Sequence, residues 1–229
     1  MKCYHHEKYM GIKGLNNFLQ CINYFRQNYV KSKGDIYCYQ GSNDKEVSEC
    51  LKENVKNNKL FKLKDGPLEQ LNNSKYLSNV TAIEKFIKDN KLSDINLITA
   101  NGVVEYKTNS HNEHQLYTII LGEIITALSI QKDNGDFVLR IEDCFTNVTI
   151  KLLNILNDCY DEIFICKPLF SRPFNNERYV ICKKFKLKST LKTNLIKKLK
   201  LLLDNMNKVK ANNNYVLDII SNSEVKSKD

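Results

Sequence analysis

The pattern of apolar and polar positions changes near residue 78, after a polar, Asn/Lys-rich start. Short apolar runs that predict buried strands occupy residues 94–100, 136–143, 162–168 and 178–186. Between them, apolar residues at helical spacing predict helices over 79–90, 112–132 and 147–160, the second with the stripe Leu116, Ile119, Ile120, Ile124 and Leu128. Strands that are apolar throughout, alternating with helices, are typical of an α/β fold with a mostly parallel sheet and helices on both faces.

The last two predicted strands are joined by a short loop. Only residues 169–177 separate them, and a parallel crossover needs about a dozen residues or more. We therefore expect the final strand to run antiparallel to the strand before it.

The flanking regions have weaker patterns. Short strands are predicted over 35–39 and 59–63. Residues 189–208 predict a basic amphipathic helix whose inward positions are Leu191, Leu195, Leu199, Leu202 and Leu203. Its lysine face is either solvated surface or a face for RNA phosphates or a partner.

We expect Thr146 to cap the helix that follows it and Phe137, Phe145 and Tyr179 to lie in the core.

Charge and cysteine usage narrow the class of protein. The formal net charge of +9 favours an anionic partner, although a generally lysine-rich composition gives the same number. The eight cysteines form no C-x-x-C pair, and several lie in apolar runs, so we expect reduced, buried thiols. We expect no metal site, because no Cys/His set has zinc-ligand spacing, and no membrane span. These features indicate a cytoplasmic or nuclear protein, of cellular or viral origin.

One motif is specific enough to indicate a family. The segment 162–186 resembles a pattern in which a strand precedes K-P-x-x-S-R-P-x-N-S-E-R-Y and a hydrophobic strand ending in C-K. The matching residues are Lys167, Pro168, Ser171, Arg172, Pro173, Asn175, Glu177, Arg178 and Tyr179, with Asn176 in place of Ser. This pattern is that of the FtsJ-like, Adrift-type, cap-specific mRNA ribose 2′-O-methyltransferases. Residues 97–105 and 126–146 resemble further parts of it, the latter matching A-L-x-x-L-x-x-G-G-x-F-V-x-K-x-F-D-x-F-T.

The resemblance implies a Rossmann-like S-adenosylmethionine-dependent methyltransferase fold with a Lys–Asp–Lys–Glu catalytic tetrad. In the family, one lysine takes the proton of the ribose 2′-hydroxyl while the oxygen attacks the methyl group of S-adenosylmethionine. Glu177 matches the glutamate, but Asn101 stands for the aspartate and Arg140 for the second lysine. The first lysine has no counterpart. Because arginine cannot act as a base at neutral pH and asparagine carries no charge, we predict a catalytically degenerate site.

The implied cofactor loop is also altered. The family has a strand followed by G-x-G-G-F, and the nearest candidate here is 11–18, with Gly11, Gly14 and, in place of a glycine, Leu15, after a poor strand. A Gly-Asp turn of the family is replaced by Asn72-Asn73. The positions expected to bind S-adenosylmethionine are therefore Gly11, Gly14, Asn73 and Asn101, in a degraded form.

These inferences give a domain plan and a function. We expect a methyltransferase-like domain over 1–188, with a divergent cofactor half (1–77) and a well-matched half (78–188), followed by a basic helix and tail over 189–229. RNA contacts are expected at Lys167, Arg172 and Arg178, with the capped mRNA 5′ end as the RNA and a capping enzyme or polymerase as partner.

Three functions remain open at this point. The first is a non-catalytic RNA-binding or stabilising subunit, and the second is an active cap 2′-O-methyltransferase in which Lys13 or Lys167 is the base. The third is an RNA-binding protein that has no partner enzyme. Glu177 is either a surviving site residue or the partner of Arg178 in a structural ion pair.

Overall fold

The computed structural model describes residues 9–12, 36–40, 61–65, 77–102, 112–169, 171, 173–212 and 216–219. Its strands are β1 (Tyr9–Ile12), β2 (Ile36–Gln40), β3 (Phe61–Asp65), β4 (Ile95–Ala100), β5 (Gln131–Ile141), β6 (Tyr160–Cys166) and β7 (Arg178–Phe185). Its helices are α3 (Val80–Asp89), α4 (Asn112–Ile130), α5 (Asn147–Cys159) and α6 (Ser189–Ala211). The predicted elements are present, with ends shifted by a few residues.

All seven strands belong to one sheet, in the order β3-β2-β1-β4-β5-β7-β6. Strand β7 is antiparallel to both of its neighbours, β5 and β6, whereas the other pairings in the sheet are parallel. The predicted antiparallel last strand is confirmed. Strand β1 pairs with β2 on one side and β4 on the other. The strand order therefore reverses between β1 and β4, and in open α/β sheets ligands bind outside the carboxyl ends of the strands at such a reversal.

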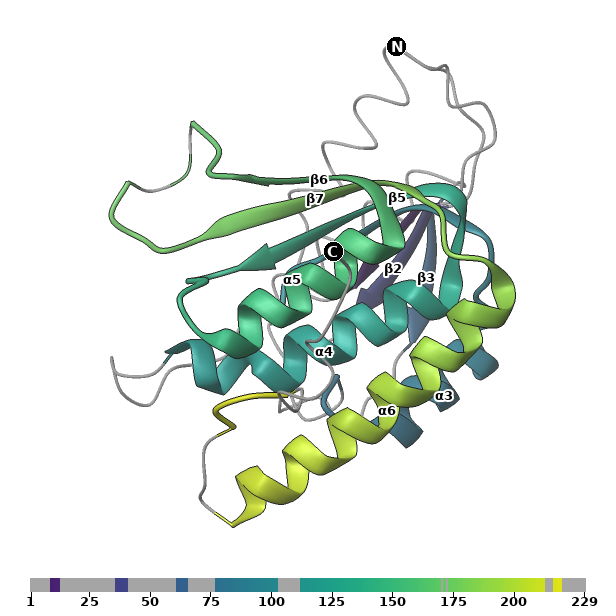
Figure 1. Cartoon of the computed structure of the whole chain (residues 1–229). Helices are drawn as coiled ribbons and strands as arrows, with labels where there is room; N and C mark the ends of the chain where they lie inside the picture. The colour runs from purple at the N-terminus through teal and green to yellow at the C-terminus, as the bar shows by residue number, and fades with distance from the viewer. Residues whose placement is uncertain are drawn as a thin grey trace.

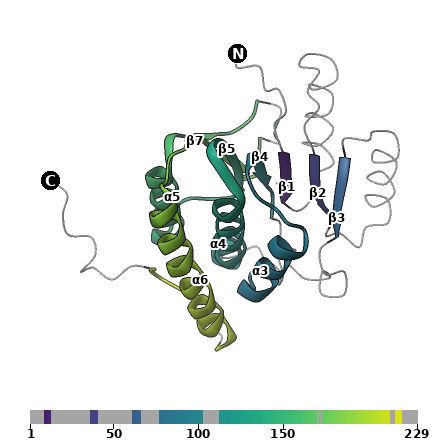
Figure 2. The same cartoon turned by 90° about the vertical axis from the view of Figure 1, so that its right-hand side faces the viewer.

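The described helices lie together against one face of the sheet (Figure 1). A second view shows α5, α4 and α3 in sequence along it, with α6 packed outside α4 (Figure 2). The links from β1 to β2 and from β2 to β3 lie outside the described residues.

Helix α4 is the centre of the core. Its predicted stripe is buried, but so are Leu121, Ile125 and Ala127 on its other sides, because the sheet, α3, α5 and α6 surround it. None of the described helices is long and apolar enough to cross a bilayer.

Two predictions of burial are wrong. Leu191 is 57% exposed, because the inward face of α6 begins at Lys192, whose Nζ donates to the carbonyl oxygen of Gln131 at 2.9 Å. Phe145 is 79% exposed in the loop before α5. Phe137 is buried as predicted, and Thr146 caps α5 by accepting a hydrogen bond from the backbone N–H of Thr149.

Strand β5 begins five residues earlier than expected, and its first residue explains how. The buried side chain of Gln131 donates to the carbonyl oxygens of Ile95 (3.1 Å) and Asp136 (3.3 Å) and accepts from the hydroxyl of Tyr160 (3.1 Å). It thus satisfies backbone groups where the β4–β5 register shifts. Asn134 lies inside this strand with a φ of 60°.

The prediction of buried thiols is right for two of the four cysteines whose burial the structure describes. Cys159 and Cys182 are buried, and burial raises the pKa of both thiols to about 12. Cys144 and Cys166 are half-buried, and all four are free. A thiol with a raised pKa is a poor nucleophile, so the two buried cysteines pack as small apolar side chains.

The packing of α4 gives a test of the fold at Gly122. Alanine favours a helix over glycine by about 1 kcal/mol, but a Cβ atom on Gly122 would overlap the carbonyl oxygen of Leu77. We expect Gly122→Ala to lower the free energy of unfolding by about 1–3 kcal/mol, measured by chemical denaturation. Ser129→Ala on the same helix is the control, with a change within about 0.5 kcal/mol. A more stable Gly122→Ala protein would contradict this packing.

Candidate functional site

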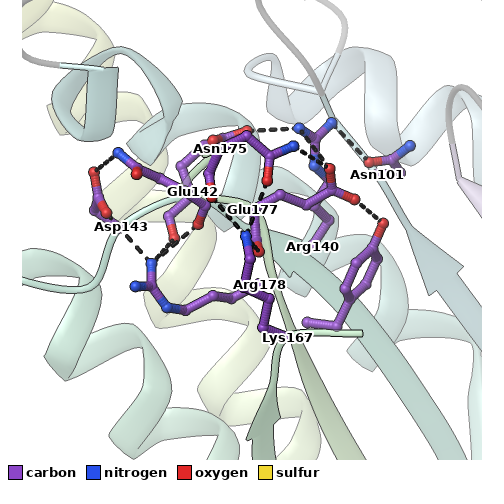
Figure 3. Close-up of polar contacts among 10 residues, drawn as sticks. Asn101, Arg140, Glu142, Asp143, Lys167, Asn175, Glu177 and Arg178 are labelled. Carbon is purple, nitrogen blue, oxygen red and sulfur yellow. Dashed lines mark hydrogen bonds and ion pairs between the residues drawn. The ribbon is translucent and has the colours of Figure 1, made fainter. Parts of the chain in front are cut away.

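The carboxyl ends of β4 and β5 bring Asn101 and Arg140 together. Asn101 follows the last residue of β4, and Arg140 follows Leu139, which pairs with Ala100. The Nη1 of Arg140 donates to Oδ1 of Asn101 at 3.1 Å. Two of the predicted tetrad positions are therefore in direct contact (Figure 3).

Strand β7 adds the third tetrad position. Tyr179 pairs with Arg140 in the β5–β7 register, which places Glu177, just before the strand, over the guanidinium. The distance from Nη2 of Arg140 to Oε2 of Glu177 is 3.8 Å. Glu177 is also held by the hydroxyl of Tyr179, which donates to Oε1, and by Nδ2 of Asn175, which donates to Oε2 at 2.9 Å.

Glu142 is a site residue that sequence reasoning missed. Its Oε1 accepts from Nη2 of Arg140 at 2.7 Å, a shorter contact than those of the guanidinium with Asn101 and Glu177. The side chains of Arg140 and Glu142 are only 15% and 14% exposed. Residues two apart on a strand share a face, and the family motif quoted above has Phe at this position. An acid in place of Phe, two residues from a substituted lysine, was the available signal.

The two glutamates have opposite pKa shifts. Burial raises the pKa of Glu142, and the positive charge of Arg140 offsets this only in part. Burial also acts to raise the pKa of Glu177, but the hydrogen bond from Tyr179 and the charge of Arg140 outweigh it and leave that pKa below its usual value. Glu177 therefore binds Arg140 as a carboxylate at neutral pH.

Lys167 and Arg178 hold the loop between β6 and β7. The Nζ of Lys167 donates to the carbonyl oxygen (2.6 Å) and Oδ1 (3.0 Å) of Asn175 and lies 3.4 Å from the carbonyl oxygen of Glu177. The Nη1 of Arg178 donates to the carbonyl oxygen of Glu142 at 3.2 Å and to Asp143 at 3.4 Å. Glu177 and Arg178 thus have separate ionic partners. Arg172 lies outside the described residues.

The expected cofactor positions are described only in part. Gly11 is the penultimate residue of β1 and pairs with Cys38 and Thr99, whereas Gly14 and Asn73 lie outside the described residues. The turn after Asn101 is fixed from α4, because the backbone N–H of Gly102 donates to Oε1 of the fully buried Glu123 at 2.6 Å. No group of three possible metal ligands occurs in the described part of the chain.

Comparison with known proteins identifies the family. Residues 25–185 match the model of the FtsJ-like methyltransferases. The chain belongs to the FtsJ-like methyltransferase family. The resemblance read from the β6–β7 segment is thereby confirmed.

Two relatives of this FtsJ-like chain are cap-specific mRNA (nucleoside-2'-O-)-methyltransferases 1. The Drosophila melanogaster protein is 34% identical over 110 residues, which are 46% of this chain and 14% of that protein. The human protein is 31% identical over 111 residues, which are 48% of this chain and 13% of that protein. The match thus covers only a small part of the length of these relatives.

A solved structure confirms the expected fold class. A Plasmodium falciparum protein described as a ribosomal RNA methyltransferase superposes with a TM-score of 0.51 over 80% of this chain and 89% of that one. At 14% identity, this likeness concerns the architecture alone. The FtsJ-like chain therefore has the methyltransferase-type α/β sheet predicted from its sequence.

The ion pairs of the site predict a pH-dependent contribution from Glu177. Because its pKa is lower in the folded protein than the value of about 4.3 in the unfolded chain, its charge stabilises the fold above that value. This stabilisation is lost as the pH falls through the folded pKa. We expect Glu177→Gln to be less stable than the native chain at neutral pH, and the difference to shrink in acid, as measured by urea denaturation across pH.

Glu84→Gln is the matched control for that experiment. Glu84 forms an exposed ion pair with Lys200, and such pairs contribute at most about 1 kcal/mol. A Glu177→Gln deficit that stays constant with pH would mean that the carboxylate charge does not stabilise the site.

Proposed function

We propose that this FtsJ-like domain does not catalyse methyl transfer itself and acts as an RNA-binding or stabilising subunit of an RNA-capping or transcription machinery. The proposal rests on the contacts of Arg140, which occupies the position of the second tetrad lysine. Its guanidinium contacts Asn101 and Glu142 and lies beside Glu177. Three of the tetrad positions, together with Glu142, are therefore joined by hydrogen bonds and ion pairs to one guanidinium.

That network is unsuited to proton abstraction. A general base must be unprotonated before it accepts a proton, whereas an arginine side chain keeps its proton at neutral pH. An arginine held in this way orders the site and accepts no proton from a ribose hydroxyl.

Lys167, the alternative base, has a similar difficulty. A lysine ammonium has three protons to donate, and three oxygens of Asn175 and Glu177 surround Nζ within 3.4 Å. These contacts direct the Nζ protons of Lys167 to protein oxygens of the β6–β7 loop. Lys13, the other candidate, lies outside the described residues.

The described residues also fit S-adenosylmethionine poorly. When bound, this cofactor would supply the methyl group, and its sulfonium and ammonium charges favour nearby carboxylates. Asn101 is neutral and contacts Arg140. The carboxylates of Glu142, Glu177 and Asp143 at this end of the sheet are each held by an arginine.

Exposed aromatic rings and cationic side chains in and near the β6–β7 loop support RNA binding. Phe174 is fully exposed in the β6–β7 loop, and Phe145 is 79% exposed after β5. Lys167 and Arg178 belong to the same loop region and hold its backbone. Aromatic rings next to basic groups are the usual platform for single-stranded RNA, and the relatives named above act on mRNA.

The first test is a methyl-transfer assay. The native chain is incubated with a capped RNA oligonucleotide and labelled S-adenosylmethionine, and we expect no labelled RNA. The triple variant Asn101→Asp/Arg140→Lys/Glu142→Phe restores the family's residues at three positions of the site. It is assayed beside the native chain, so that the two proteins differ only at these positions. Transfer by the native chain that disappears in Glu177→Ala would overturn the non-catalytic assignment and favour an active cap methyltransferase.

The second test concerns RNA affinity. Because a stacked base contributes about 1–3 kcal/mol, we expect Phe174→Ala to weaken binding of a capped single-stranded oligonucleotide roughly tenfold, measured by fluorescence anisotropy. Arg178→Ala should lower the slope of log affinity against log salt by about 1. Lys198→Ala, on the exposed side of α6, is the control and should bind as the native chain does.

The control also separates the alternatives. An equal loss in Lys198→Ala would place the RNA on the basic face of α6. The absence of any salt-dependent binding by the isolated chain would exclude a free-standing RNA-binding protein and leave the partner-dependent subunit.

A further inference from the structure

Strand β6 forms an unusually apolar edge of the sheet. It is the outermost strand and pairs only with β7 among the described residues, and Figure 1 shows it at the margin of the sheet. At its middle, Phe164 is 48% exposed and Ile165 is 49% exposed. An outermost strand presents unpaired N–H and C=O groups, and natural sheets usually protect such an edge with charged residues or proline.

The opposite edge of the same sheet has a more charged sequence. Strand β3, the other outermost strand, carries Lys62, Lys64 and Asp65 within five residues. Strand β6 has acidic residues only near its start, and the apolar sequence Ile163–Ile165 contains no charge. The two edges therefore differ in the feature that prevents strand pairing between molecules.

We infer that β6 pairs with β6 of a second copy of this chain, antiparallel and centred on Phe164. In that register Phe164 lies opposite itself and Ile163 lies opposite Ile165. Asp161 then lies opposite Lys167, and both are exposed. In this register the strand matches its own reverse in its central apolar residues and at Asp161 and Lys167, and Glu162 faces Cys166.

Neighbouring registers lose this complementarity. Centring on Ile163 places Asp161 opposite Ile165, and centring on Ile165 places Ile163 opposite Lys167. Either arrangement sets a charge against an apolar side chain, and opposite charges or apolar pairs are what stabilise facing positions in a sheet. The geometry thus selects a single alignment.

The pairing would cover apolar surface on both faces of the sheet. Ile163 and Ile165 share a face with the buried Cys182 and Val180, their partners on β7, on the side that α5 covers. Phe164 lies on the other face, where Nζ of Lys183 is 5.1 Å from its ring centre. Because a one-strand contact is small compared with about 1,200–2,000 Å² for a stable complex, we expect a concentration-dependent equilibrium between monomer and dimer.

Sedimentation velocity over a range of concentrations tests the pairing in the full chain. We expect the native chain to shift from monomer to dimer and Phe164→Lys to remain monomeric, because two lysines would face each other at the centre. Leu201→Lys is the matched control, since Leu201 is also an exposed apolar residue, 64% exposed, but lies on α6. It should dimerise as the native chain does, and circular dichroism checks that each variant is folded.

A disulfide then tests the register independently. Glu162 is expected opposite Cys166 of the second copy, at the spacing of facing strand residues, about 4.5–5.5 Å, which a disulfide can span. In Glu162→Cys, mild oxidation should join position 162 to Cys166 between two chains, identified by mass spectrometry. Lys186→Cys, beyond the end of β7, is the control and should give no such link.

Each outcome decides the inference. A native chain that stays monomeric at all concentrations, or a dimer that Leu201→Lys dissolves as fully as Phe164→Lys, overturns it. A dimer whose disulfide joins other positions overturns the register. The inference does not rest on the proposed function, because neither experiment requires RNA or methyl transfer.

Discussion

The antiparallel pairing of β7 between β5 and β6 is the constraint on which the candidate site depends. It sets Tyr179 beside Arg140 on one side and beside Cys166 on the other. Glu177, the residue immediately before the strand, is thereby brought to the guanidinium, although 36 residues lie between the two in sequence. If the last strand ran parallel to β5, its first residue would lie at the amino end of β5. Glu177 would then be too far from Arg140 to form an ion pair.

The same pairing gives the site its electrostatic character. Two glutamates surround one arginine that is 15% exposed, and removing one partner of such a pair leaves a charge that is poorly solvated. The fixed fork of arginine suits simultaneous contact with an amide and carboxylates, whereas lysine, a single point charge, suits proton transfer when its pKa is lowered. Arg140 therefore orders the end of β5 through contacts with an amide and two carboxylates.

The sequence predicted the strands, the main helices and the proximity of Asn101, Arg140 and Glu177 because these follow from hydrophobic periodicity and a specific motif. It failed where a tertiary partner decides the outcome. Leu191 has the helical spacing of an inward residue, but the phase of α6 is set by its packing on α4, which turns Lys192 inward. Glu142 was missed because its pairing with Arg140 depends on side-chain direction at the end of a strand, which periodicity in apolar residues does not report.

The negative charge of Glu142 offsets the charge that is missing at Asn101. At positions 101, 140, 142 and 177 the family pattern implied by the resemblance is Asp, Lys, Phe and Glu, with a formal sum of one negative charge. Asn, Arg, Glu and Glu in this chain give the same sum, so the negative charge lost after β4 reappears two residues after Arg140. In this chain the negative charge lies at position 142, where it contacts one arginine, and position 101, where the family pattern has an aspartate beside two lysines, is neutral.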